Sequence, residues 1–108
     1  MINVVYDEAC GITMTGHAGQ APRGQDIVCA GASAIVISLA EMLERNSEEL
    51  IERGILLESG RASIKVVPRG AFKNCCEGAF EMAMCGLELL SEQYPDYICV
   101  SRVAGNGE

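Results

Sequence analysis

The sequence predicts one α+β (α/β) domain over residues 1–108, in the order ββαββαβ, with a mixed, largely antiparallel sheet packed with two helices. Pairs of short segments alternate apolar and polar residues, which is typical of half-buried strands. Two longer segments repeat apolar residues at helical spacing. The length of 108 residues suits a single hydrophobic core. Strand order does not follow from these patterns.

Two strands are expected first. Residues 2–7 and 11–15 alternate in the strand period, and residues 7–11 supply the turn between them. Residues 16–25 are rich in glycine and small side chains and follow neither period, so we expect a loop there.

A helix of about five turns is expected from Asp26 to residues 45–46. Its apolar face consists of Val28, Ala32, Ile35, Val36, Leu39 and Leu43. A second hairpin follows, with strands at residues 50–58 and 61–67 around a turn at Ser59 and Gly60.

The last segments predict a helix, a strand and a tail. Residues 72–93 have helical spacing with a narrow polar stripe, which predicts that the helix is covered on more than one side, by the sheet and the other helix or by a second subunit. Residues 96–103 predict a strand, and residues 104–108 a frayed tail.

The composition favours a cytoplasmic protein with a basic partner. The formal net charge is −7 and the eight Lys and Arg residues form no run, so direct binding of nucleic acid is not expected. No apolar leader begins the sequence, and no stretch approaches the roughly 18 consecutive apolar residues of a membrane span. In the reducing cytoplasm the six cysteines are expected to remain free thiols.

His17 is the one histidine of the chain, and it stands near the start of the predicted loop. An imidazole is the side chain best suited to general-base catalysis near neutral pH. A lone histidine is more often unrelated to catalysis, so its position in the loop is what favours a functional role.

Cys29 occupies the third helical position if Asp26 is the N-cap of the first helix. Free backbone N–H groups and the positive end of the helix dipole would stabilise a thiolate there and supply oxyanion donors. Glycines and a proline let the loop bring His17 back over the helix start. The hypothesis is a nucleophile and a base in one pocket, and the alternative is a buried, inert cysteine.

Two residues close to Cys29 in the sequence, Asp26 and Ser33, could support catalysis or serve only the structure of the helix. Asp26 could orient the imidazole or simply cap the helix. Ser33 follows Cys29 by one turn, where its hydroxyl could touch the nucleophile or a substrate, or bond back to the preceding turn. The remaining cysteines lack zinc-site spacing and are interpreted as packing residues, so neither metal nor cofactor is expected. They are Cys10, Cys75, Cys76, Cys85 and Cys99.

Two blocks of sequence carry a family likeness. The first is Gly16-His17-Ala18, and the second is Gly24-Gln25-Asp26-Ile27-Val28-Cys29-Ala30-Gly31-Ala32-Ser33, which places Cys29 twelve positions after His17. Together they resemble the ribosomal-processing cysteine protease family (Prp). The likeness is strongest over residues 16–34, and the element order of nearly the whole chain is compatible with it.

The resemblance implies a cytoplasmic bacterial endopeptidase, typically a homodimer, that removes an N-terminal extension from large-subunit ribosomal protein twenty-seven during ribosome assembly. It implies that Cys29 is the nucleophile and His17 the general base, with Asp26 and Ser33 as helpers. Family substrates usually carry phenylalanines before the cut and a small residue after it, which implies an apolar pocket beside Cys29. Residues 20–23 lack the aromatic residue common in relatives, so substrate contacts of that loop do not transfer.

Two functions of other classes fit the same residues. In a non-catalytic ribosome-assembly module, the motif would only shape a binding groove. A thiol acyl transferase or thioesterase acting on a small molecule would use the same attack chemistry, although the sequence lacks a Gly-rich phosphate-binding motif for coenzyme A. Measurements of Cys29 reactivity and of peptide cleavage distinguish the protease from the assembly module and from the acyl transferase or thioesterase.

Overall fold

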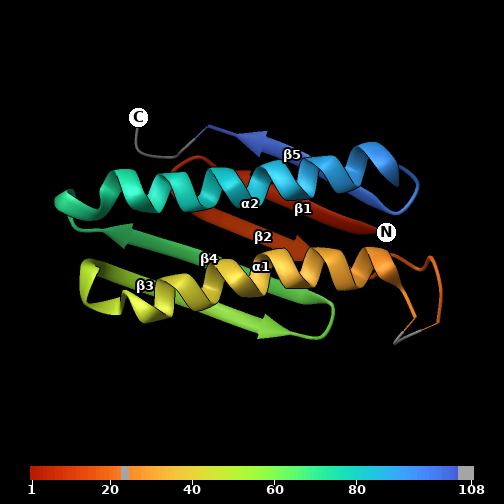
Figure 1. Cartoon of the computed structure of the whole chain (residues 1–108), viewed down its shortest axis with the longest axis horizontal. Coiled ribbons are helices and arrows are strands. Elements are labelled where there is room, and N and C mark those ends of the chain that lie inside the picture. Colours follow the sequence, from red (N-terminus) through yellow and green to blue (C-terminus); the bar gives the residue numbers. More distant parts are fainter. Residues whose placement is uncertain (23–24, 105–108) are drawn as a thin grey trace.

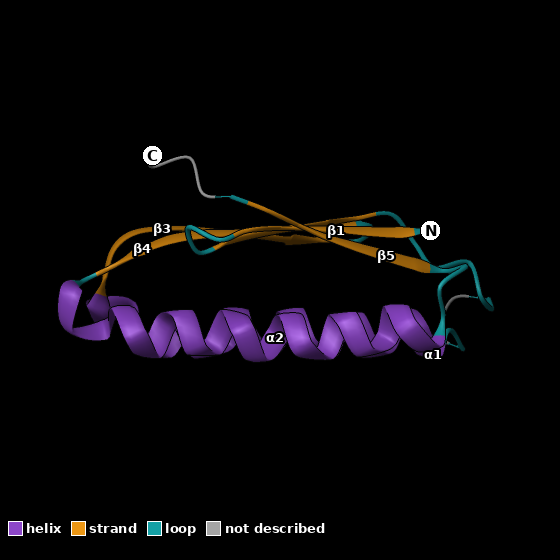
Figure 2. Cartoon of the chain, turned by 90° about the horizontal axis from the view of Figure 1, so that it is seen from above, coloured by secondary structure: helices purple, strands orange, loops and turns teal. Residues whose placement is uncertain are grey.

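The computed structural model describes residues 1–22 and 25–104, which form a five-stranded sheet with two long helices on one of its faces (Figures 1 and 2). The predicted order ββαββαβ is confirmed. Two short 3-10 turns at Ser47–Glu49 and Gly70–Phe72 flank the second hairpin. The strands and helices are β1 (Ile2–Asp7), β2 (Gly11–Thr15), α1 (Ile27–Arg45), β3 (Leu50–Glu58), β4 (Arg61–Pro68), α2 (Lys73–Gln93) and β5 (Ile98–Val103).

The sheet has the strand order β3-β4-β2-β1-β5. Both predicted hairpins form, and β2 pairs with β4 to join them in antiparallel fashion. Only β5 is parallel to its neighbour, β1, because α2 crosses the sheet between β4 and β5. The prediction of a mixed, largely antiparallel sheet is therefore correct.

The core lies between the sheet and the helices, as the strand alternation predicts. Val4, Ile64 and Val66 are each 1% exposed and face the helix layer. From the helices, Leu43 and Phe80 are fully buried. Burial of each such side chain contributes about 1.5–3 kcal/mol, so this layer is the main source of stability.

Glycines let the two helices lie side by side. A Cβ atom on Gly31 of α1 would lie 3.3 Å from a methyl group of Leu90 on α2. A Cβ atom on Gly86 of α2 would lie 2.8 Å from a methyl group of Ile35 on α1. Large side chains of each helix thus use the space that glycine leaves on the other.

Two predicted boundaries shift. The second helix begins at Lys73 rather than residue 72, because Gly70–Phe72 forms a 3-10 turn. The last strand begins at Ile98 rather than residue 96. The backbone N–H groups of Tyr97 and Ile98 both donate to the Tyr94 carbonyl, which holds a turn around Pro95. Of the predicted tail, residues 105–108 lie outside the described residues, as do residues 23–24 of the predicted loop.

α1 is long and apolar enough to cross a membrane if length and composition alone are considered. Core helices of globular domains often satisfy both criteria. Here 33% of the tested window is buried, and Val28, Val36 and Leu43 pack into the core.

The prediction that five cysteines are packing residues is correct for two of them. Cys10 and Cys76 are buried, whereas Cys75, Cys85 and Cys99 are exposed. α2 is covered on two sides, by the sheet and by α1, as one of the two alternatives predicted, while its outer face exposes Met82 and Leu89. Cys99 points away from the helices, since its neighbour Ile98 is buried. All six thiols are free, as predicted.

Candidate active site

Asp26 is the N-cap of α1, as predicted, and it joins the preceding loop to the helix. One carboxylate oxygen accepts the Cys29 N–H at 2.9 Å, and the other accepts the Gln20 N–H at 3.0 Å. These backbone bonds, that from Cys29 foremost, hold the pKa of the Asp26 carboxyl below its ordinary value. Asp26 is the one buried charged residue of the part of the chain described, and its charge is compensated by those donors.

The Cys29 thiol is half-buried near the start of α1 and accepts a hydrogen bond from the backbone N–H of Ala18 at 3.3 Å. This hydrogen bond fixes the sulfur beside the loop that carries His17. The Cys29 N–H, one of the helix-start groups expected to be free, is bonded to Asp26. The Ala18 N–H is the backbone donor that the structure places on the sulfur.

His17 is exposed beside the same thiol, and its backbone is anchored to the β3–β4 turn. The N–H of Gly16 donates to the carbonyl of Gly60 at 2.8 Å. Gly16 has φ +92°, and the carbonyl of Met1 occupies the space where a Cβ atom would lie. Only glycine suits this position, so His17 leaves β2 in a defined direction.

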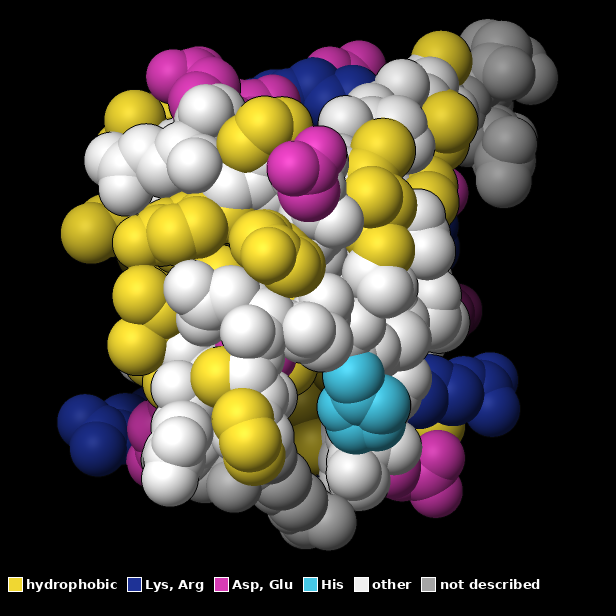
Figure 3. All heavy atoms as spheres, turned by 90° about the vertical axis from the view of Figure 1, so that its right-hand side faces the viewer, with side chains coloured by type: hydrophobic (Ala, Val, Ile, Leu, Met, Phe, Trp, Pro, Cys, Tyr) yellow, Lys and Arg dark blue, Asp and Glu magenta, His cyan; other side chains and the backbone are white. Residues whose placement is uncertain are grey.

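These residues surround one cavity of about 570 Å³ at the end of the molecule shown in Figure 3, where the imidazole stands at the rim. His17, Asp26, Cys29 and Ser33 all line it, so the four residues singled out in the sequence come together. Within the described residues, the imidazole forms no hydrogen bond with the thiol, whose donor is Ala18.

A second cavity of about 250 Å³ lies farther along α1 and shares Met14, Ser33, Glu58 and Ser59 with the first. Its other lining residues are apolar: Val36, Ile37, Leu57 and Ala62. Ser33 therefore stands between the thiol and an apolar recess. The arrangement suits an extended chain that carries a large apolar side chain.

Sequence reasoning missed the β3–β4 turn as part of the site. Ser59, Gly60 and Arg61 line the main cavity. They reach it because β4 pairs with β2 in a register that sets Arg61 opposite Thr15, two residues before His17. A turn more than forty residues away carries no local signal of that pairing. Among residues 1–22 and 25–104, no cluster of three metal-ligating side chains occurs.

Comparison with known proteins identifies the family of the chain. The model of a family described as cysteine protease Prp matches residues 1–99. The ribosomal processing protease Prp of S. aureus, in complex with a covalently linked product peptide, has a similar structure, with a TM-score of 0.77, 21% identity, and coverage of 94% of this chain and 97% of that chain.

A structure from Streptococcus mutans is also similar, with a TM-score of 0.67, 21% identity, and coverage of 95% of this chain and 92% of that chain. No curated protein matches. Because the family model spans nearly the whole sequence, this chain belongs to the cysteine protease Prp family.

Proposed function

We propose that Cys29 is the nucleophile and His17 the general base of an endopeptidase that removes the N-terminal extension of large-subunit ribosomal protein twenty-seven. The observation that carries the proposal is the Cys29 thiol, which accepts the Ala18 N–H in a cavity that His17 also lines. Family membership supplies the reaction class.

In the proposed mechanism, the imidazole takes the thiol proton and the thiolate attacks the scissile carbonyl. The imidazolium then protonates the leaving amine, and water hydrolyses the acyl-enzyme. His17 is exposed and lines the same cavity as Cys29, so its side chain can turn toward the sulfur as substrate binds. As the sulfur bonds to the carbonyl carbon it loses its negative charge, and the Ala18 N–H can then donate to the oxyanion of the tetrahedral intermediate.

Asp26 and Ser33 support this chemistry in different ways. Asp26 holds the loop residue Gln20 and the helix start together, so its role is to keep Ala18 and Cys29 in place. Ser33 lines both cavities and borders the path of the substrate.

The substrate assignment is supported by charge, shape and relatives. Proteases of similar fold from S. aureus were crystallised with a substrate peptide and with a product peptide. The formal charge of −7 suits a basic ribosomal protein. The apolar recess beside Ser33 suits a phenylalanine that precedes the cut.

The test is cleavage of the extended ribosomal protein by the wild type and by Cys29→Ala and His17→Ala variants. We expect Cys29→Ala to abolish cleavage and His17→Ala to slow it by about 10²–10⁴-fold, since proton transfer by a positioned base contributes that much. Cys85→Ala is the matched control, because Cys85 is an exposed thiol on α2. Cleavage at the wild-type rate by His17→Ala would remove the dyad. Turnover of small thioesters without peptide cleavage would favour the acyl-transfer alternative.

We also propose a cytoplasmic homodimer. The outer face of α2 exposes Met82 and Leu89, at 80% and 57%, together with Cys75 and Cys85, and an antiparallel copy of this stripe would cover it. Light scattering should give a dimer for the wild type and a monomer for Met82→Glu, with Ser47→Glu as the charge control, because Ser47 is exposed and lies outside α2. A monomeric wild type contradicts the dimer, and recovery of the processing activity outside the cytoplasmic fraction contradicts the location.

A further inference from the structure

The β3–β4 turn touches His17 from the side opposite the helix. Ser59 and Gly60 are the two turn residues, since Glu58 still pairs with Arg61. The Gly60 carbonyl accepts the Gly16 N–H at 2.8 Å, which holds the turn beside the residue that precedes His17. The turn therefore contacts this segment twice, through the backbone of Gly16 and through the side chain of His17.

Gly60 offers the imidazole a surface that no other residue type could provide. A Cβ atom at this position would lie 2.8 Å from His17 Nε2, 3.3 Å from Cε1 and 3.5 Å from Cδ2. The outer edge of the ring therefore rests on the backbone of the turn. Gly60 also has φ +77°, which most L residues rarely adopt, so the backbone favours glycine and the contact with the ring requires it.

We propose that Gly60 is a positioning residue for His17, and that the β3–β4 turn sets where Nε2 lies relative to the Cys29 thiol. This inference rests on the proposed role of His17 as base. An exposed imidazole with no support samples several rotamers, and a base is efficient only within a narrow range of positions. Contact with the turn restricts that range.

A side chain at position 60 should displace the ring and leave the fold intact. The clashing atoms belong to the far end of a flexible, exposed side chain, so His17 moves more easily than the paired strands. Gly19 provides the matched control. Its φ is +73°, almost the same, but nothing lies within 4 Å of the Cβ atom that a substitution would add. Gly19 lines the same cavity, so Gly19→Ala measures the effect of backbone strain in the site without a Cβ contact on the imidazole.

The first measurement follows the imidazole itself. His17 is the only histidine, so its ring signals in an NMR spectrum belong to one residue. We expect Gly60→Ala to shift these signals by more than Gly19→Ala does, because only the Cβ atom added at position 60 meets the ring. Gly60→Asn is the second variant, because asparagine tolerates positive φ and so keeps the turn while adding the Cβ atom. Ring signals that stay in place in both Gly60 variants would overturn the proposal.

The second measurement follows the chemistry. Alkylation of Cys29 by iodoacetamide, read by mass spectrometry across pH, should change its pH profile in the Gly60 variants, with exposed Cys85 of the same molecule as internal standard. For peptide cleavage, kcat should fall by about 10- to 100-fold, as expected for a misplaced catalytic group, while KM changes little. A loss no larger than that of Gly19→Ala would overturn the proposal.

The two measurements separate this inference from the proposed function. NMR reads the ring position without any catalysis. If Gly60→Ala displaces the ring but the His17→Ala variant still cleaves normally, the dyad is contradicted and the role of Gly60 in placing the ring stands. A ring that stays in place, in an enzyme inactivated by His17→Ala, contradicts the role of Gly60 alone.

Discussion

Asp26 acts at the scale of a single carboxylate, and its effect should depend on pH. Its folded pKa lies below the ordinary value of 3.8, chiefly because the Cys29 N–H donates to it. A group with a lowered folded pKa contributes stability that is present above the unfolded pKa and is lost as pH falls through the folded pKa. The stability contributed by Asp26 should therefore be complete near neutral pH and disappear in strong acid.

Asp26→Asn keeps a capping side chain but removes the charge. We expect its melting temperature to be lower than the wild type's near neutral pH, and the two to converge as pH falls below the ordinary carboxyl pKa of 3.8. Thermal unfolding followed by circular dichroism across pH measures this. A constant difference at every pH would show that the charge of Asp26 is not what stabilises the loop.

Cys75 and Cys76 form a natural pair for testing burial at the residue scale. Cys76 lies 3.9 Å from Cys10, sulfur to sulfur, and burial raises the pKa of Cys76 to about 12 and also raises that of Cys10. Cys75, next in sequence, is exposed. Because the thiolate is the reactive form, iodoacetamide on the native protein should modify Cys75 and spare Cys76 and Cys10. Equal modification of Cys75 and Cys76, read by mass spectrometry, would contradict this packing.

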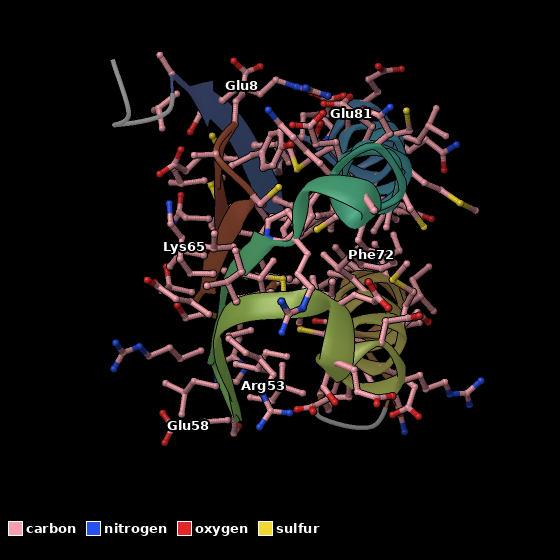
Figure 4. The ribbon with its side chains drawn as sticks, turned by 90° about the vertical axis from the view of Figure 1, so that its left-hand side faces the viewer. Glu8, Arg53, Glu58, Lys65, Phe72 and Glu81 are labelled. Atoms are coloured by element: carbon pink, nitrogen blue, oxygen red, sulfur yellow. The ribbon has the colours of Figure 1, made fainter. Side chains whose placement is uncertain are left out.

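At the scale of elements, Arg102 ties β5 to α2. Its guanidinium contacts Glu81 at 2.9 Å and Glu88 at 3.0 Å, and lies 5.4 Å from the centre of the Tyr6 ring. Figure 4 shows Glu8 and Glu81 at this edge of the sheet. The hydrogen bonds to Glu88 and Glu81 raise the pKa of Arg102, and the bond to Arg102 lowers that of Glu88. This parallel edge strand therefore depends on a charged network as well as on Ile98.

Arg102→Met should lower the melting temperature by a few degrees, since several partners share one cation. The effect should shrink at high salt, because screening weakens the same contacts in the wild type. Arg45→Met is the control, because the Arg45–Glu41 pair is 76% and 58% exposed and should contribute little. Equal effects of the two substitutions would argue that the network does not hold β5.

At the scale of the whole molecule, one layer of side chains between sheet and helices carries the stability. Phe80 is fully buried and stacks on Tyr6 with ring centres 6.0 Å apart. Phe80→Ala should cost about 3–5 kcal/mol, a large part of the stability of a small domain. Ile51→Ala, at a position 62% exposed on β3, should change stability by less than about 0.5 kcal/mol. Urea unfolding measures both, and similar losses would contradict the assigned core.

The sequence alone determined the elements, their buried faces and the N-cap at Asp26, because periodicity and capping depend on residues only a few positions apart. The motif around His17 and Cys29 identified the family for the same local reason. Tertiary structure alone decided that β1 lies between β2 and β5, that α2 exposes Met82 and Cys75, and that Gly60 touches the imidazole. These depend on contacts between segments far apart in the chain, and no local pattern encodes which segments become neighbours.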